Sequence, residues 1–305
     1  KKSYLLSMDE QNTPPPYIHR VATGTSSPFI FAAPHSGRYY PADFKARSVL
    51  TENTLRKSED AFVDKLFADV PAQRASLLIA THARAYLDLN RAENELDPKL
   101  FTPQLAIETV NISHRVQAGL GIIPQFVAEN TPIYASLLPA REAEKRIKAI
   151  HGPYHRKLAH LLKKNLTTHG SAILIDCHSM PSDSLTGGSK IKQTPDIILG
   201  DCWGTSCRAD LTDLAETLLL SAGFNVRRNV PYSGGFSTAF YGEPEAGIHA
   251  LQIEINRSLY MDEATLRPLP AFDAVQQKLA IFSQHLIATM TKRIKRTAIG
   301  SLAAE

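Results

Sequence analysis

The most constraining feature of this sequence is an uninterrupted apolar run at residues 172–176 (Ala-Ile-Leu-Ile-Asp), which ends in a carboxylate. Continuous aliphatic runs of this length are typical of strands that are buried on both faces of a sheet. A second run of the same kind covers residues 197–200 (Ile-Ile-Leu-Gly). Because both faces of such a sheet must be covered, the runs favour an α/β architecture with a mainly parallel sheet.

Further strand and helix patterns alternate along the chain, and no shift in composition marks a linker. We therefore predict a single α/β domain over residues 1–305, with an irregular segment at residues 1–20. Apolar residues at three- and four-residue spacing indicate helices, and short apolar runs indicate strands. The predicted strands are residues 29–33, 76–82, 224–226 and 249–255, and the predicted helices are residues 57–70, 132–169 (interrupted by Pro139 and Pro153), 210–221 and 271–294.

Composition narrows the function classes. Hydrophobic residues make up 43% and charged residues 21% of the 305 residues, which excludes a disordered chain or a coiled coil. The formal charge of +4 is too small for a nucleic-acid binder and mildly favours an anionic small-molecule substrate. No apolar run approaches the roughly 18 residues of a membrane helix, and residues 1–12 lack the apolar segment of a signal peptide.

Three cysteines give no disulfide framework, so we expect a cytoplasmic protein. The sequence does not determine its oligomeric state.

Four polar side chains lie where catalytic groups of an open α/β sheet collect, just beyond the carboxyl ends of strands. His35 follows the run at 29–33, His178 follows the run at 172–176, Glu254 lies inside the run at 249–255, and Asp60 opens the predicted helix at 57–70. Two imidazoles and a carboxylate are a common ligand set for catalytic zinc, which lowers the pKa of water to about 7. His35, Asp60 and His178 are therefore candidate ligands, and Glu254 is a candidate general base.

Asp176 precedes His178 by two residues, so both side chains leave the strand on the same face, and Asp176 is a candidate partner of the imidazole. Each assignment has a structural alternative. A histidine at a strand end is more often hydrogen-bonded than metal-bound, and Asp60 could serve the helix dipole. Glu254 has the stronger case, because a carboxylate inside an apolar strand is costly unless it is paired or functional.

A second polar cluster consists of Arg84, Asp88, Asn90 and Arg91. Arginine binds carboxylates through two parallel hydrogen bonds, and an adjacent asparagine adds a neutral donor, so the cluster suits a substrate that carries a carboxylate. The residues alone favour the alternative, a surface ion pair between Asp88 and Arg91 on a turn. The glycines at 234–235, with Ser237 and Thr238, fit either close approach to a ligand or a hairpin turn.

Nine short motifs occur in the order seen in N-formylglutamate amidohydrolases, and the chain resembles that family from the first of them to the strand bearing Glu254. The motifs are Pro34-His35-Ser36-Gly37, Ser58-Glu59-Asp60-Ala61-Phe62-Val63-Asp64, Leu87-Asp88-Leu89-Asn90-Arg91, Thr131-Pro132-Ile133-Tyr134, Pro153-Tyr154-His155, Ile175-Asp176-Cys177-His178-Ser179-Met180, Pro195-Asp196-Ile197-Ile198-Leu199-Gly200, Gly234-Gly235-Phe236-Ser237-Thr238 and Gln252-Ile253-Glu254-Ile255-Asn256.

The resemblance implies a fold like that of zinc carboxypeptidases and aspartoacylases, an α/β/α sandwich with a mixed, mostly parallel sheet of about eight strands. It implies hydrolysis of N-formyl-L-glutamate to formate and glutamate, a step of bacterial histidine degradation. One Zn²⁺, or another divalent metal, would be the cofactor. The open alternatives are hydrolysis of another N-acyl amino acid or a peptide, and a non-catalytic binder of acidic acyl-amino acids.

The resemblance also assigns roles to residues. It supports the ligands and the base named above, and gives Arg84 the role of polarising the substrate carbonyl. The implied substrate contacts are Asn90, Arg91, His155, Gly235 and Thr238. Carboxypeptidases carry the carboxylate ligand three residues after the first histidine, but that position here is Arg38. Asp60 is therefore the expected carboxylate ligand, with Glu59 as the alternative.

Two other hydrolase mechanisms are disfavoured. Cys177 and His178 are neighbours on a predicted strand, so their side chains point to opposite faces and cannot act as nucleophile and base. The Gly-x-Ser-x-Gly motif of serine esterases is absent from the sequence.

Overall fold

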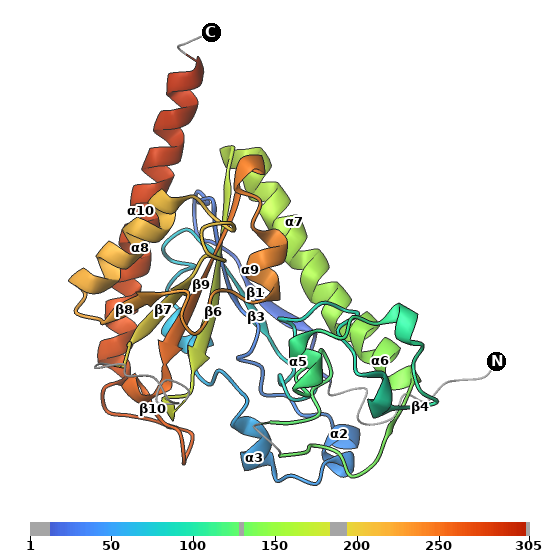
Figure 1. Cartoon of the computed structure of the whole chain (residues 1–305). Helices are drawn as coiled ribbons and strands as arrows, with labels where there is room; N and C mark the ends of the chain where they lie inside the picture. Colours follow the sequence, from blue (N-terminus) through green and yellow to red (C-terminus); the bar gives the residue numbers. More distant parts are fainter. Residues whose placement is uncertain (1–12, 128–130, 184–193, 303–305) are drawn as a thin grey trace, which may run out of the picture. The chain divides into compact units, whose positions relative to one another are not determined.

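The computed structural model describes residues 13–127, 131–183 and 194–302. Its main element is one seven-stranded sheet (Figure 1), where about eight strands were expected. In spatial order, the strands are β1 (Tyr17–Arg20), β3 (Ser76–Ala80), β2 (Phe29–Ala33), β6 (Ala172–Met180), β9 (Ile248–Asn256), β7 (Ile197–Gly200) and β8 (Val226–Arg228).

The sheet is mixed, as predicted. Strands β2 and β3, β2 and β6, β6 and β9, and β7 and β8 pair in parallel, whereas β7 runs antiparallel to β9. Two further short pairs, β4 (Phe101–Thr102) with β5 (Leu138–Pro139) and β10 (Met261–Asp262) with β11 (Arg267–Pro268), lie outside this sheet. The mixed α/β fold expected from the sequence is therefore confirmed.

Contacts divide the chain into two compact units. The first comprises residues up to 18, 35–59 and 80–154, and the second comprises residues 19–34, 60–79 and 155 onward. Helices of the first unit are α2 (Ala42–Arg47), α3 (Glu52–Arg56), α5 (His114–Gln117), α6 (Arg141–Arg146) and a π-helical turn (Ile147–His151). Those of the second are α4 (Val63–Leu66), α7 (Gly152–His169, from residue 155), α8 (Ala209–Ser221), α9 (Phe236–Tyr241) and α10 (Phe272–Leu302).

The first unit packs around a buried cation. The guanidinium of Arg146 lies 4.1 Å from the ring centroid of Tyr86, and the residue is 1% exposed. Its Nη1 donates to the main-chain oxygen of Tyr86 at 3.1 Å and to Tyr134 Oη at 3.0 Å. Glu142 lies one helical turn away, with an N···O distance of 3.4 Å. The aromatic rings and the carboxylate together compensate a charge that would otherwise be costly to bury.

The core of the second unit follows from strand alternation. Phe31, Ile175 and Ile253 are completely buried and point to the same face of the sheet as their neighbours two residues away. Helices α4, α8 and α10 cover this face, and α9 packs on β6 and β9. In Figure 1, α8 and α10 lie on one side of the strands, with α7 and α9 on the other. This places the intervening residues of β6 and β9 on the face away from that core.

The predicted helix over residues 57–70 is wrong. Only α4, four residues long, forms there, and turns occupy most of the remainder. Phe62 adopts φ +67°, a left-handed conformation that cannot continue a right-handed helix. Asp60 therefore lies in a turn before α4 rather than in the first turn of a helix.

Other predicted boundaries need smaller corrections. Strand β6 continues to Met180 instead of stopping at residue 176, and α10 continues beyond residue 294. The long pattern at 132–169 divides into α6, the π-helical turn and α7. Gly170 and Gly223 have φ values of +71° and +83°, and each ends a helix in the left-handed conformation expected of a glycine there. Strand β1 lies inside the segment expected to be irregular.

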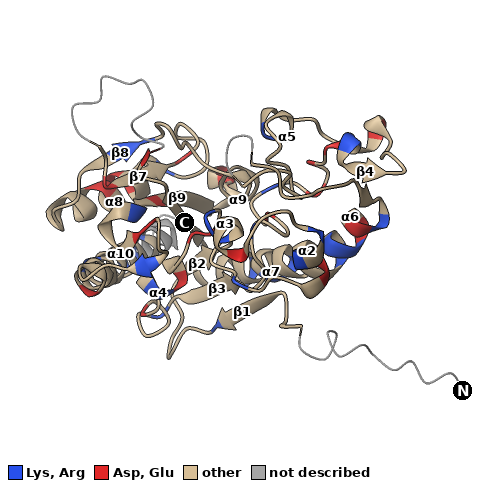
Figure 2. Cartoon of the chain, turned by 90° about the horizontal axis from the view of Figure 1, so that it is seen from below, with Lys and Arg blue, Asp and Glu red and all other residues tan. Residues whose placement is uncertain are grey.

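The helices in the described part of the chain include none with the length and apolarity that a membrane span requires. In Figure 2, helices α2, α4 and α6 each carry both acidic and basic residues, in keeping with the small formal charge.

Candidate active site

The ladder between β6 and β9 sets the geometry of the site. Asp176 is the register partner of Gln252, and His178 is the register partner of Glu254. All four residues are buried, at 8% exposure or less. They alternate with the aliphatic residues of the core, so their side chains lie on the opposite face of the sheet. Two strands therefore place an imidazole and three polar groups side by side.

His178 contacts a carboxylate at each ring nitrogen. Its Nδ1 lies 3.0 Å from Asp60 Oδ2, and its Nε2 lies 3.0 Å from Asp176 Oδ2. Burial alone would lower the pKa of His178, but Asp176, Asp60 and the charge of Glu254 together raise it well above its usual value. The surroundings of this imidazole therefore favour positive charge.

Asp60 is held by an arginine that the sequence analysis did not single out. Arg257 Nη2 lies 3.0 Å from Asp60 Oδ1, and Arg257 Nε lies 3.2 Å from Ser179 Oγ. Arg257 is 6% exposed and begins the 3₁₀ turn that directly follows β9 (Arg257–Leu259). The signal in the sequence that could have pointed to Arg257 is its position, just after a predicted buried strand. Its partner, however, lies 197 residues away in the sequence.

His35 is the second residue after β2, which pairs directly with β6. Its Nε2 lies 2.7 Å from Asp88 Oδ1. Asp88 also accepts from the main-chain N–H of Asn90 at 2.8 Å and from Arg84 Nε at 3.0 Å. The residue is 1% exposed. Asp88 does pair with Arg91, whose Nη2 lies 3.5 Å from Asp88 Oδ2, but both side chains are buried, so this is not the surface ion pair that the alternative supposed. Asp88 is a buried carboxylate that also orients His35.

The electrostatics of Asp88 are those of a compensated buried anion. Burial alone would raise the pKa of Asp88, but Arg91, Arg84 and His35 hold it well below its usual value. Asp88 is thus a permanent carboxylate at neutral pH and can accept the Nε2 proton of His35.

The three predicted metal ligands are close together. His35, Asp60 and His178 each offer one ligand atom, these atoms lie within 4.8 Å of one another, and all three residues are buried. Two imidazoles and one carboxylate suit zinc and other divalent metals. Each imidazole has one ring nitrogen, Nε2, within hydrogen-bond distance of a carboxylate, namely Asp88 for His35 and Asp176 for His178. This pattern is typical of metal-binding histidines. The residues present therefore fit a metal ion.

Glu59, the alternative to Asp60, has other partners. It accepts a hydrogen bond from Tyr40 Oη at 2.7 Å and forms an ion pair with Arg56 Nε at 3.2 Å. Burial raises the pKa of Glu59 despite these contacts. Among the described residues, the metal-ligand cluster contains Asp60 and not Glu59.

Glu254 is positioned by its own strand. Gln252 Nε2 donates to Glu254 Oε1 at 2.9 Å, and Gln252 Oε1 accepts from the main-chain N–H of Gly235 at 2.6 Å. The side-chain amide of Gln252 therefore links the candidate base to the start of α9. Cys177, between Asp176 and His178, lies in the hydrophobic core, and burial raises the pKa of its thiol well above the usual value. This argues against Cys177 as a nucleophile.

The predicted substrate contacts of the first unit are Arg84, Asn90 and Arg91. The side chain of Arg84 is 26% exposed, whereas Asn90 and Arg91 are buried. Arg91 donates to the main-chain oxygens of Leu120 at 2.8 Å and Asn90 at 2.7 Å. Burial lowers the pKa of Arg91 to about 10. Arg91 is thus tied to the main chain on two sides.

The predicted contacts of the second unit gather around α9. Thr238 Oγ1 lies 3.4 Å from Asp176 Oδ2, and Gly235 caps the helix without forming the hairpin that the glycines also allowed. His155 Nδ1 lies 2.9 Å from Tyr241 Oη. A Cβ at Gly234, which has φ +139°, would lie 2.6 Å from Cys202 Sγ. The glycine is therefore required by close approach within the fold.

A mixed α/β sheet that carries a buried histidine–carboxylate cluster toward the carboxyl ends of β6 and β9 defines the general class, that of α/β enzymes whose site is built near this edge. The match of a family model to residues 27–261 then gives the family: the chain belongs to the N-formylglutamate amidohydrolases.

Relatives agree with this assignment. The chain is 30% identical over 242 residues to a protein of Pseudomonas aeruginosa named N-formylglutamate deformylase, covering 77% of this chain and 83% of the relative. A protein of the same name from Pseudomonas putida is 29% identical over 241 residues, covering 77% and 82%.

Solved structures show the same fold. The crystal structure of N-formylglutamate amidohydrolase from Ralstonia eutropha matches with a TM-score of 0.87 and 32% identity, covering 93% of this chain and 100% of the other. A gene product of Agrobacterium tumefaciens matches with a TM-score of 0.64 and 16% identity over 92% of this chain and 97% of the other, a likeness of fold alone.

Proposed function

We propose that this chain is a metal-dependent amidohydrolase that converts N-formyl-L-glutamate, or a closely similar N-acyl amino acid, to the free acid and the amino acid. The observation that carries the proposal is the cluster of His35, Asp60 and His178, with Glu254 in register beside His178. The relatives named N-formylglutamate deformylase support the choice of substrate.

His35, Asp60 and His178 would hold the ion, and zinc suits their nitrogen and oxygen donors. A divalent ion bound there supplies Lewis acidity toward the substrate carbonyl and makes water a stronger nucleophile at neutral pH. Asp88 and Asp176 keep the two imidazoles in the tautomer with the proton on Nε2, which directs Nδ1 toward the ion. Arg257 fixes the orientation of Asp60 through the 3.0 Å contact between their side chains.

Glu254 takes the proton of the attacking water and transfers it to the departing amine. Its carboxylate is the group suited to this role, because Glu254 is the register partner of His178 and Gln252 Nε2 orients it through a 2.9 Å hydrogen bond. Arg84 would polarise the scissile carbonyl with its partly exposed guanidinium. Asn90 and Arg91 would bind a substrate carboxylate, and His155, Gly235 and Thr238 are proposed as further contacts.

The test pairs metal analysis with a substrate panel. The purified protein should contain one divalent metal per chain, and removing it with a chelator should abolish the hydrolysis of N-formylglutamate, which re-added zinc restores. The panel comprises N-formyl, N-acetyl and N-succinyl derivatives of glutamate and aspartate, together with short peptides. The highest kcat/KM for an N-formyl amino acid would support the proposal. Full activity after verified metal removal would refute the mechanism, and turnover of peptides alone would refute the substrate.

A further inference from the structure

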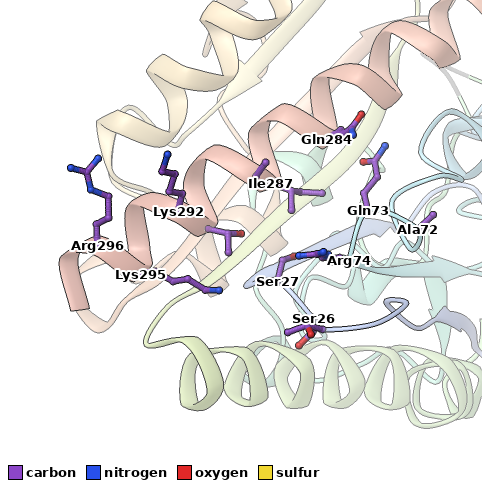
Figure 3. Close-up of a pocket in the computed structure, with 13 residues that line it drawn as sticks. Ser26, Ser27, Ala72, Gln73, Arg74, Gln284, Ile287, Lys292, Lys295 and Arg296 are labelled. Carbon is purple, nitrogen blue, oxygen red and sulfur yellow. The ribbon is translucent and has the colours of Figure 1, made fainter. Parts of the chain in front are cut away.

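A cavity lies at the amino end of strand β2. It has a volume of about 610 Å³ and is enclosed by residues before β2, the loop before β3 and the carboxyl-terminal half of α10 (Figure 3). Ser27 precedes the first residue of β2, whereas His35 follows its last. The cavity therefore belongs to the amino end of β2 and is separate from the candidate active site. It is lined by Thr25, Ser26, Ser27, Ala72, Gln73, Arg74, Gln284, Ile287, Ala288, Thr291, Lys292, Lys295 and Arg296.

The lining is cationic. Four of its residues, Arg74, Lys292, Lys295 and Arg296, are basic, and none of the lining residues is acidic. Within the residues that the structure describes, no carboxylate lies within salt-bridge distance of Arg74 or Lys295. In Figure 3, Lys295 extends from α10 toward Ser27 and Arg74, whereas Arg296 and Lys292 extend away from them. Arg74 and Lys295 thus line the cavity from two different elements, the loop before β3 and α10.

Uncharged donors complete the lining. Thr291 lines the cavity, but its hydroxyl oxygen is buried away from it and has no hydrogen-bond partner. By contrast, Gln73 donates to the main-chain oxygen of Ala280 at 2.9 Å and accepts from Ser283 Oγ at 2.7 Å. The side chain of Gln73 is therefore a fixed part of the cavity lining.

Arg74 is held in place by its main chain. Its φ is +72°, and its carbonyl oxygen accepts from the N–H of Ser27 at 2.8 Å. This hydrogen bond joins the segment before β2 to the loop before β3 at the mouth of the cavity. The main chain from which the Arg74 side chain extends is therefore fixed. The neighbouring His169, whose Nε2 lies 3.4 Å from Ser26 Oγ, has its pKa lowered by burial and by the charge of Lys295. The local potential is accordingly positive.

We propose that this cavity binds a small oxyanion, a phosphate or carboxylate group, through the side chains of Arg74 and Lys295. Guanidinium and ammonium groups bind both kinds of anion through charge-assisted hydrogen bonds. The proposal gives the protein a ligand site outside its catalytic centre, and it does not depend on the proposed reaction.

Isothermal titration calorimetry on the metal-containing enzyme tests this site, with inorganic phosphate and glutarate as probes at constant chloride. At least one probe should bind saturably. Arg74→Gln and Lys295→Gln should each weaken that binding by about tenfold or more, the loss expected for a charge-assisted hydrogen bond. Arg267→Gln removes the same charge from the exposed strand β11 and should leave the affinity unchanged.

Thr291→Val keeps every charge and should weaken binding less than the charge variants do. Thermal unfolding of each variant without anion shows whether the fold is intact, and Lys295→Gln on the surface of α10 remains informative should Arg74→Gln not fold. Binding of phosphate alone or of glutarate alone identifies the anion and supports the site when the charge variants weaken that binding. Absence of saturable binding at millimolar concentrations, or binding that neither charge variant weakens, would overturn it.

Discussion

Glu254 stands opposite His178 across the parallel ladder of β6 and β9. On its other side, Glu254 is paired in register with Ile198 of the antiparallel strand β7. The carboxylate is therefore positioned by three strands and not by a loop. Groups held on strands keep their geometry better than groups on loops do, and this suits the proton-transfer role that is proposed for Glu254.

Glu254→Gln should abolish most hydrolysis while the protein keeps its metal. The amide has nearly the same shape but cannot accept a proton, so kcat should fall by about a hundredfold to ten-thousandfold. Formate release and metal content, measured on the same sample, check this. Glu245→Gln, an exposed carboxylate in the same unit, is the matched control and should have wild-type kcat. A Glu254→Gln enzyme with normal kcat would remove this residue from the mechanism.

Asp60→Asn and Glu59→Gln form a pair that identifies the carboxylate ligand. Asp60→Asn should weaken metal binding by more than about a hundredfold. A hundredfold is the upper end of the loss expected when the altered residue contacts a metal ligand but does not itself bind the metal. Glu59→Gln should retain one metal per chain, because Glu59 is occupied by Tyr40 and Arg56. Competition with a chromogenic chelator measures both affinities. The opposite ranking of the two variants would assign the ligand to Glu59.

Arg257→Met should destabilise the fold by about 3 kcal/mol, because it leaves the buried carboxylate of Asp60 without its cation. It should also weaken metal binding by about tenfold to a hundredfold, since Asp60 is then free to turn. Arg257→Lys keeps the charge and should restore part of both losses. Urea denaturation and metal titration give the two numbers. A loss of stability with unchanged metal affinity would show that Arg257 does not position Asp60.

His82 should make the stability of the protein depend on pH. Burial lowers its pKa to about 4, from 6.5 in the unfolded chain. Between these values the unfolded chain binds a proton that the folded protein does not, so the free energy of unfolding falls as the pH is lowered from about 6.5 to 4. The shift corresponds to about 3 kcal/mol at the acid end.

The variant His82→Gln should remove this acid-dependent loss, although it also loses contacts with Tyr39 and Tyr86. The observable is therefore the difference in slope between variant and wild type in urea denaturation at several pH values, and not the absolute stability. His160→Gln on α7, an exposed imidazole, is the control. Equal slopes for His82→Gln and wild type would contradict the prediction.

The sequence predicted the strands that carry the site better than the segment between them. The runs at 29–33 and 197–200 match β2 and β7, because a fully buried strand needs a continuous apolar run. The helix expected at 57–70 failed because Phe62 takes a left-handed conformation, which the spacing of apolar residues does not reveal. Asp60 was thus named as a candidate ligand on the basis of a helix that does not form.

The contacts that orient the ligands could not be read from local patterns. Asp88 looked like a surface residue on a turn, because its burial depends on folding around His35, 53 residues earlier in the sequence. Arg257 and Asp60 are still farther apart. Pairings of this kind are properties of the folded chain, whereas His35 and His178 were named because they follow apolar runs and Glu254 because it lies inside one. Sequence reasoning therefore named candidate groups and missed the side chains that contact them.

Because Asp176 and His178 lie on the face of β6 opposite the core residues Ile175 and Cys177, the alignment of β6 with β2 and β9 governs folding and chemistry together. Displacing β6 by a single position would turn Asp176 and His178 into the hydrophobic core. It would also place aliphatic side chains on the face that carries the proposed active site. An insertion or deletion of one amino acid in this strand would therefore affect the packing of the core and the geometry of the proposed site together. Evolution can therefore shorten or lengthen the loops on either side, but the count of residues within β6 is fixed.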